Sequence, residues 1–227
     1  MRYGEKPMSD RIKDSYKASK NIYDDILTRK NIFAKLYMKL FWQDVDDNKI
    51  AEELLKYIPD KFRGKLLDVP VGTGVFTCEK YKRMTKADIT CLDYSEDMLV
   101  QARTRFLAND IGNVTLVQGD VGALPFEDGE FDVLLSMNGF HAFPDKNRAF
   151  SEMTRVLKKG GKLVACFYIR GRSKVTDALV KNVLAKKGWF TPPFDTSGEL
   201  MKRLERAYEV TNWHIRGSMV YFKAIRK

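Results

Sequence analysis

A strand, a glycine turn and the start of a helix are predicted within residues 65–76, which read KLLDVPVGTGVF. The apolar run ends at Asp68 and is followed by Gly72 and Gly74. Glycine reaches positive φ without strain, and it has no Cβ to collide with a ligand that passes close to the backbone. The stretch therefore predicts a ligand-binding turn, although a glycine turn that merely joins a strand to a helix has the same pattern.

The rest of the chain alternates strand-like and helix-like stretches in the order that a parallel sheet covered by helices requires. Strands are predicted at residues 66–70, 89–93, 114–118, 131–137 and 162–169. Helices are predicted at residues 75–83, 96–108, 146–157 and 174–186, with Ser95 as the N-cap of the second. We therefore expect an α/β fold with a doubly wound, mostly parallel seven-stranded sheet and helices on both faces.

The two last strands are predicted at residues 208–215 and 219–225, and only Arg216, Gly217 and Ser218 separate them. Three residues are too few for a parallel crossover, so these strands must pair as an antiparallel hairpin. A C-terminal hairpin distinguishes this sheet from the purely parallel sheet of dinucleotide-binding domains.

The chain divides into two predicted regions. Residues 1–60 form an N-terminal helical region, where apolar residues recur at helical spacing from Ile22 to Phe41 and either pack on the domain or form a lid. Residues 61–227 form the α/β domain, with 170–207 as a helical and aromatic-loop insertion. This insertion contains GWFTPPFDT, which suits an aromatic lid or a structural plug, and Thr196 and Glu199 have capping-box spacing.

Composition narrows the class of protein. The 227 residues include no apolar run of membrane-spanning length and no apolar leader, so we expect a cytoplasmic protein without a membrane span. The three cysteines form no CxxC pair and are predicted to be buried thiols. The net charge of +10 is scattered, with a mild concentration at residues 170–187, which favours solvated helix faces over a specific nucleic-acid partner. Two histidines and no ligand cluster predict no metal site.

Several motifs together resemble the class I S-adenosylmethionine-dependent methyltransferases, in particular the small-molecule branch that includes the quinone-ring C-methyltransferases. LLDVPVGTG is similar to the family's first motif, and Asp93 follows the glycines by about twenty residues, as its ribose-binding acid does. QGDVGALPFEDGEFDVLLSMNGFHAFPD and EMTRVLKKGGKLVACFY resemble the motifs that follow. The resemblance covers residues 65–168 and, more loosely, the terminal hairpin.

The resemblance implies S-adenosylmethionine as cofactor, S-adenosylhomocysteine as product, and a small-molecule methyl acceptor. Asp93 would bind the ribose diol, and Asp68 would face the ammonium of the methionine part, directly or through water. Asp120 and Val121 would bind the adenine, although Asp120 also suits a turn cap. Tyr94 and Met98 would pack on the adenine, although a methionine in the first turn of a helix, such as Met98, also suits the core. The expected cofactor-binding residues are Asp68, Pro70, Gly72, Gly74, Asp93, Tyr94, Met98, Asp120, Val121 and Asn138.

One residue departs from the family pattern: Pro70 stands where the first glycine is usual. Proline fixes φ near −65° and lacks an N–H, so this position must need neither positive φ nor a donor. The other two glycines of the motif, Gly72 and Gly74, are present.

Methyl transfer needs alignment and the exclusion of water more than it needs a base. His141 is the candidate base if the acceptor must lose a proton, although a histidine here can also serve only in packing. Tyr168 either orients substrate or belongs to the core edge. RNA or protein methylation is the alternative function, prompted by the basic charge. A nicotinamide-dependent oxidoreductase is disfavoured because Thr77 occupies the third glycine position of G-x-G-x-x-G.

Overall fold

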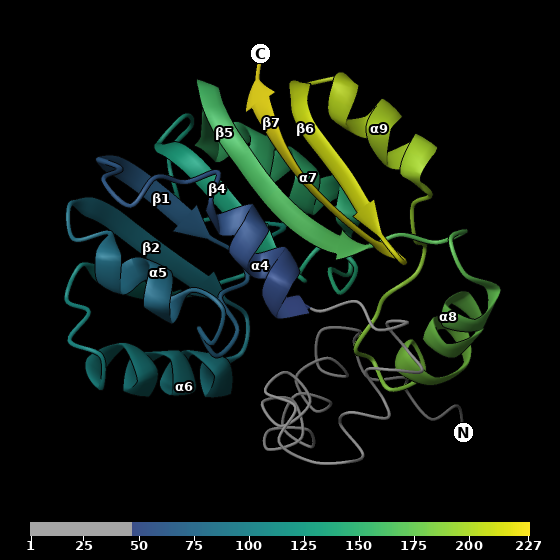
Figure 1. Cartoon of the computed structure of the whole chain (residues 1–227), viewed down its shortest axis with the longest axis horizontal. Helices are drawn as coiled ribbons and strands as arrows, with labels where there is room; N and C mark the ends of the chain where they lie inside the picture. Colours follow the sequence, from purple (N-terminus) through teal and green to yellow (C-terminus); the bar gives the residue numbers. More distant parts are fainter. Residues whose placement is uncertain (1–46) are drawn as a thin grey trace, which may run out of the picture.

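The computed structural model describes residues 47–227, and within them one seven-stranded sheet organises the fold (Figure 1). The strands are β1 (Gly64–Asp68), β2 (Ala87–Asp93), β3 (Val114–Gln118), β4 (Phe131–Met137), β5 (Leu157–Tyr168), β6 (Tyr208–Arg216) and β7 (Met219–Arg226). The helices are α4 (Asp47–Leu55), α5 (Cys78–Arg83), α6 (Glu96–Leu107), α7 (Lys146–Val156), α8 (Lys174–Leu179), the π-helix η1 (Val180–Leu184) and α9 (Ser197–Glu205).

The strand order is β3-β2-β1-β4-β5-β7-β6. Strands β1 to β5 pair in parallel, whereas β7 is antiparallel to both β5 and β6. The predicted doubly wound sheet and its C-terminal hairpin are therefore confirmed. The order reverses between β1 and β4, and in sheets of this kind ligands bind beyond the carboxyl ends of the strands at such a switch point.

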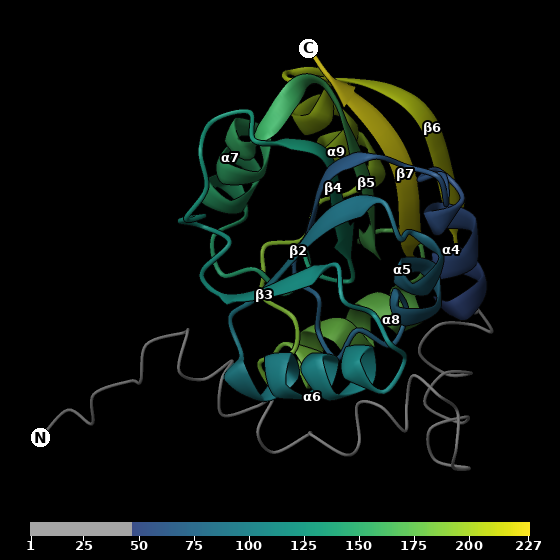
Figure 2. The same ribbon diagram turned by 90° about the vertical axis from the view of Figure 1, so that its left-hand side faces the viewer.

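Side chains that alternate along each strand build two apolar layers. On β5, Val164 and Cys166 face the helices α4, α5, α6 and η1, whereas Leu163 and Ala165 face α7 and α9. Figure 2 shows α7 on one side of the sheet and α4 and α5 on the other. Continuous apolar strands covered on both faces are what a parallel sheet requires.

Several element boundaries differ from the prediction for physical reasons. β1 ends at Asp68, two residues before the predicted Pro70, because proline has no N–H to extend the ladder. The predicted helix over 174–186 is split, since Ala185 N donates to Val180 O with π-helical spacing while Val180 and Leu184 point into the core. Ser95 occupies the N-cap of α6 but makes no side-chain cap bond, whereas Thr196 and Glu199 form the predicted capping box.

The structure describes residues 47–60 of the predicted N-terminal helical region. α4 lies inside the predicted helical region 1–60 and packs Ile50 and Leu54 against the sheet beside β5 and β7. The predicted lid over residues 22–41 lies outside the described residues. Within residues 47–227, no helix has the length and apolar character that crossing a bilayer demands.

Candidate functional site

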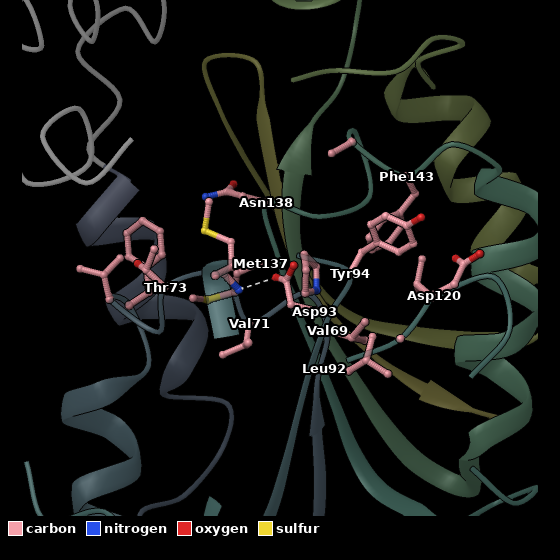
Figure 3. Close-up of a pocket in the computed structure, with 18 of the residues that line it drawn as sticks. Val69, Val71, Thr73, Leu92, Asp93, Tyr94, Asp120, Met137, Asn138 and Phe143 are labelled. Atoms are coloured by element: carbon pink, nitrogen blue, oxygen red, sulfur yellow. Dashed lines mark hydrogen bonds between the residues drawn. The ribbon is translucent and has the colours of Figure 1, made fainter. Parts of the chain in front are cut away.

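A cavity lies at the carboxyl ends of β1 to β4, where the loops that follow these strands converge (Figure 3). It opens at the switch point between β1 and β4. The lining residues are Val69, Pro70, Val71, Gly72, Thr73, Val75, Phe76, Leu92, Asp93, Tyr94, Met98, Gly119, Asp120, Val121, Met137, Asn138, Ala142, Phe143 and Pro144. Of the ten predicted cofactor-binding residues, all except Asp68 and Gly74 are among them.

The two glycines of the loop after β1 are each required for a different structural reason. Both have positive φ, +58° at Gly72 and +70° at Gly74. A Cβ at Gly72 would meet no atom within 4 Å, so this glycine leaves open space beside the cavity. A Cβ at Gly74 would lie 2.7 Å from the Phe106 ring of α6, so this glycine allows the loop to pack on the helix. Gly72 suits close approach by a ligand, whereas Gly74 suits packing.

Asp93 ends β2 and is the buried acid of the cavity. Its Oδ2 accepts from Gly72 N at 2.8 Å and its Oδ1 accepts from Ser95 N at 2.9 Å, so the carboxylate also holds the glycine loop (Figure 3). Only 7% of the residue is exposed, and burial raises the pKa of Asp93 to about 6 although these backbone donors favour the charged form. The carboxylate is therefore ionised at neutral pH and ready to accept from a ligand.

Pro70, in the loop after β1, packs against Gly139 in the loop after β4. A Cβ at Gly139 would clash with the Pro70 ring, so a glycine at 139 accommodates the proline that stands in the cofactor motif. The neighbouring Asn138 has φ +55°, and its N–H donates to Cys166 O at 2.8 Å. Asn138 lines the cavity, and its Oδ1 is buried without a hydrogen-bond partner.

The remaining predicted contacts surround the opposite end of the cavity. Asp120 is exposed, and its Oδ1 accepts from Gly122 N at 2.8 Å, so the residue caps a turn and lines the cavity at once. Val121 and Met98 are buried in the wall, whereas Tyr94 is 37% exposed at the rim. Both the core and the cavity interpretations of Met98 thus apply.

Asp68 lies behind the cavity wall instead of in it. The Tyr81 hydroxyl donates to its Oδ2 at 2.7 Å, and only 1% of the residue is exposed. Burial raises the pKa of Asp68 to about 7, with the charge of Asp93 adding to the shift. A direct contact between this carboxylate and a ligand ammonium is not provided by this geometry.

The predicted base, His141, is held in the core next to the cavity and does not line it. Its Nδ1 accepts from Tyr168 N at 3.2 Å, and its ring stacks on Phe190 at 4.0 Å between centroids. Burial lowers the pKa of His141 to about 3, so the ring is neutral throughout the physiological range. This placement supports the packing role that the sequence left open for His141, because its acceptor nitrogen and its ring face are both used there.

The aromatic insertion braces the loop after β4. Thr191 N donates to His141 O at 2.9 Å, and Thr191 Oγ1 donates to Ala142 O at 3.0 Å. The buried Lys146 ammonium donates to the carbonyls of Thr191 and Phe143. Since residues 188–196 line no part of the cavity, the arrangement agrees with a structural plug and not with a lid in contact with ligand.

Sequence reasoning missed the wall formed by Ala142, Phe143 and Pro144. Their only signal was their place directly after a strand that ends in a motif. The chemistry of the whole wall is nevertheless clear, because its charged members are both acidic, Asp93 and Asp120, and no lysine, arginine or histidine among the described residues lines it. Residues 47–227 also contain no cluster of three or more potential metal ligands.

The cavity fits an adenosyl cofactor that carries positive charge. Gly72 leaves room for close approach, Asp93 can accept from a ribose diol, and the acidic wall suits a sulfonium and an ammonium. Fold and site together define a domain of the S-adenosylmethionine-dependent methyltransferase class.

Comparisons with known proteins agree with this class. Residues 66–161 match a family model described as a methyltransferase domain. The ubiquinone/menaquinone biosynthesis C-methyltransferase UbiE of Shewanella sp. (strain ANA-3) is 36% identical over 131 residues, which cover 55% of this chain and 52% of the relative. An uncharacterized chloroplastic methyltransferase of Arabidopsis thaliana is 32% identical over 130 residues, which cover 55% of this chain and 36% of that protein.

The fold is also found in solved structures. A SAM-dependent methyltransferase from Thermotoga maritima superposes with a TM-score of 0.66 and 20% identity, covering 95% of this chain and 100% of the other. Residues 66–161 thus match a methyltransferase domain, and S-adenosylmethionine is the cofactor that such a domain implies. The chain spans about half the length of the UbiE relative that it matches.

Proposed function

We propose that this protein transfers a methyl group from S-adenosylmethionine to a small, apolar or aromatic acceptor. The observation that carries the proposal is the composition of the cavity wall, which combines the buried Asp93 carboxylate with mainly apolar side chains. A strongly polar acceptor would lose its hydration in this cavity. An anionic acceptor would also find no positively charged side chain among the described residues that line it.

The half of the cavity near β2 and β3 is the proposed adenosyl site. Asp93 accepts from the ribose hydroxyls while Gly72 keeps the backbone out of the way. Asp120 accepts from the adenine amino group through its Oδ2, and Val121 offers its backbone N–H. Tyr94 and Met98 contact the ring faces. Asp68 acts indirectly in this proposal, through the Tyr81 hydroxyl bond that fixes the end of β1.

The half near β4 is the proposed acceptor site. Its wall includes Phe76, Met137, Phe143 and Pro144, whose side chains exclude water from the reacting atoms. The cofactor supplies an electrophilic methyl on a sulfonium, and this chain supplies alignment of the acceptor with it. Because His141 is buried, neutral and outside the cavity, the proposed reaction uses no histidine base. Asn138, predicted from the sequence as a cofactor contact, lines the cavity with an Oδ1 that has no hydrogen-bond partner within residues 47–227 and could accept from a bound ligand.

The chemical type of the acceptor is proposed more narrowly from the relatives. UbiE is named as a C-methyltransferase of ubiquinone and menaquinone biosynthesis, and an aromatic ring of that kind would suit the apolar wall of this cavity. Hydroquinones are therefore the first acceptors to test, followed by simple phenols. The alternative of RNA or protein methylation is disfavoured because no basic side chain of the described residues lines the cavity.

The proposal is tested by incubating the protein with S-adenosylmethionine labelled in its methyl group. Apolar hydroquinones and phenols, total RNA and a protein extract would be offered in parallel, with Asp93→Ala as the control. We expect label in the organic-soluble small molecules, and its loss in the variant. Asp93-dependent label in RNA or protein alone would overturn the proposed acceptor class, and no transfer to any of them would overturn the activity.

A further inference from the structure

The segment from Arg172 to Lys187 carries an exposed basic face that the reaction does not use. Five cations lie on it without an ion pair among the described residues: Arg172, Lys174, Lys181, Lys186 and Lys187. The one acid in the segment, Asp177, is engaged by the Tyr168 hydroxyl at 2.6 Å and by Gly171 N at 2.9 Å. The neighbouring Arg170 is neutralised by Glu199 at 2.9 Å.

Apolar side chains are interleaved with these cations. Val175 is 64% exposed and Val183 is 36% exposed, which makes them two of the large apolar residues that the described surface leaves in solvent. The opposite side of the segment is fixed in the core by Val180 and Leu184, both fully buried. The outward direction of the lysines and exposed valines is therefore set by the fold.

The position of this face relative to the cavity also matters. α8 follows β5 at its carboxyl end, and the cavity is built by the loops at the carboxyl ends of β1 to β4. Figure 1 shows α8 beyond the tips of these strands. The basic face and the cavity therefore lie at the same end of the sheet, beyond the carboxyl ends of its parallel strands.

We propose that the exposed face of α8 and η1, formed by Arg172, Lys174, Val175, Lys181, Val183, Lys186 and Lys187, docks the protein on anionic lipid surfaces. Cations that alternate with exposed aliphatic side chains attract lipid headgroups and insert apolar groups at the level below them. Lys187 Nζ lies 5.1 Å from the ring centroid of the half-buried Trp189, which adds an amphipathic ring to one end of the face. A single-stranded nucleic acid would instead favour exposed aromatic rings for stacking, whereas this face exposes valines.

Docking would give the protein access to acceptors that concentrate in a bilayer, a consequence that depends on the proposed function. The docking itself does not depend on it, because vesicle binding requires no methyl transfer. Failure of the acceptor assignment and failure of the docking are therefore separate results.

The test uses the full-length chain and co-sedimentation with phosphatidylcholine vesicles, with and without phosphatidylglycerol. Lys181→Gln, Lys186→Gln and Lys187→Gln are combined in one variant. The control variant combines Lys61→Gln, Arg63→Gln and Lys86→Gln, which are exposed at the opposite edge of the sheet, ahead of β1 and β2. Both variants lose the same net charge.

We expect the wild-type protein to bind only the anionic vesicles, and binding to weaken as salt is added. The partition of the α8–η1 variant onto anionic vesicles should be at least about tenfold lower than that of the wild-type protein. The partition of the control variant should change by about twofold at most. A third variant, Val175→Ser with Val183→Ser, should also bind less although its charge is unchanged. No binding to anionic vesicles, or equal losses in the two lysine variants, would overturn the proposal. A gel shift with RNA that depends on these lysines, without vesicle binding, would assign the face to nucleic acid instead.

Discussion

At the scale of single residues, the loop after β1 depends on two glycines with positive φ angles. Gly72 and Gly74 both have positive φ, yet one faces the cavity and the other faces Phe106. The same substitution at the two positions should therefore have different consequences, although in sequence they are members of one motif.

Gly72→Ala and Gly74→Ala test this difference. Gly72→Ala should cost about 1 kcal/mol of stability from the positive φ and weaken S-adenosylhomocysteine binding, because its new Cβ fills ligand space. Gly74→Ala should cost roughly 2 kcal/mol or more, since its Cβ also collides with the Phe106 ring. Chemical denaturation and calorimetric titration of both variants measure the two effects. Equal stability and equal affinity in the two variants would contradict these separate roles.

Eight of the ten predicted cofactor-binding residues line the cavity, because they sit at fixed offsets from strand ends. Gly72, Asp93, Asp120 and Asn138 all lie within a few residues of the carboxyl end of a strand, and parallel strands bring those ends together. His141 could not be placed in this way. Its orientation depends on Phe190, a residue about fifty positions later in the chain that no periodicity relates to it.

At the scale of elements, the insertion between β5 and β6 supports the loop after β4. The Lys146 ammonium donates both to the Thr191 carbonyl and to the carbonyl of the wall residue Phe143, and the Thr191 hydroxyl donates to Ala142 O. The positions of the strands were predictable from apolar runs, although β5 begins at Leu157, five residues before its predicted start. This brace was not predictable, because it joins segments that are distant in the chain through a lysine whose burial the sequence does not indicate.

Lys146→Met tests the brace. The variant removes the donor to the Thr191 and Phe143 carbonyls, so the Thr191 amide should exchange with deuterium faster. Hydrogen exchange followed by mass spectrometry of peptides across residues 188–196 measures this change. Lys186→Met, at an exposed position in the same insertion, is the matched control and should leave the exchange unchanged. Unchanged protection in Lys146→Met would show that the insertion is held by its aromatic contacts alone.

At the scale of the whole molecule, the buried acids at the carboxyl ends of β1 and β2 lower stability at neutral pH. Asp68 has a pKa near 7 in the folded protein against an ordinary value of 3.8, so the folded state binds its proton more tightly. The stability contributed by that proton is complete below about pH 4 and is lost as the pH rises to about 7. Asp93, with a pKa near 6, acts in the same direction.

Asp68→Asn should therefore be more stable than the wild-type protein at neutral pH, because the amide can still accept from Tyr81 without carrying charge. The difference in the free energy of unfolding should grow from about pH 4 to about pH 7 and then level off. Urea denaturation across this range measures it, with the exposed Asp88→Asn as control. A difference that does not vary with pH would contradict the raised pKa of Asp68.

Binding of an adenosyl cofactor in the cavity through Asp93 can be measured by calorimetry. S-adenosylhomocysteine, S-adenosylmethionine and NADH would each be titrated into the wild-type protein and into Asp93→Ala. The account predicts binding of the two adenosyl ligands and not of NADH, weakened by roughly 2 kcal/mol or more in the variant through loss of a charge-assisted hydrogen bond. Adenosyl binding that is unchanged in Asp93→Ala, or NADH binding in its place, would contradict the account.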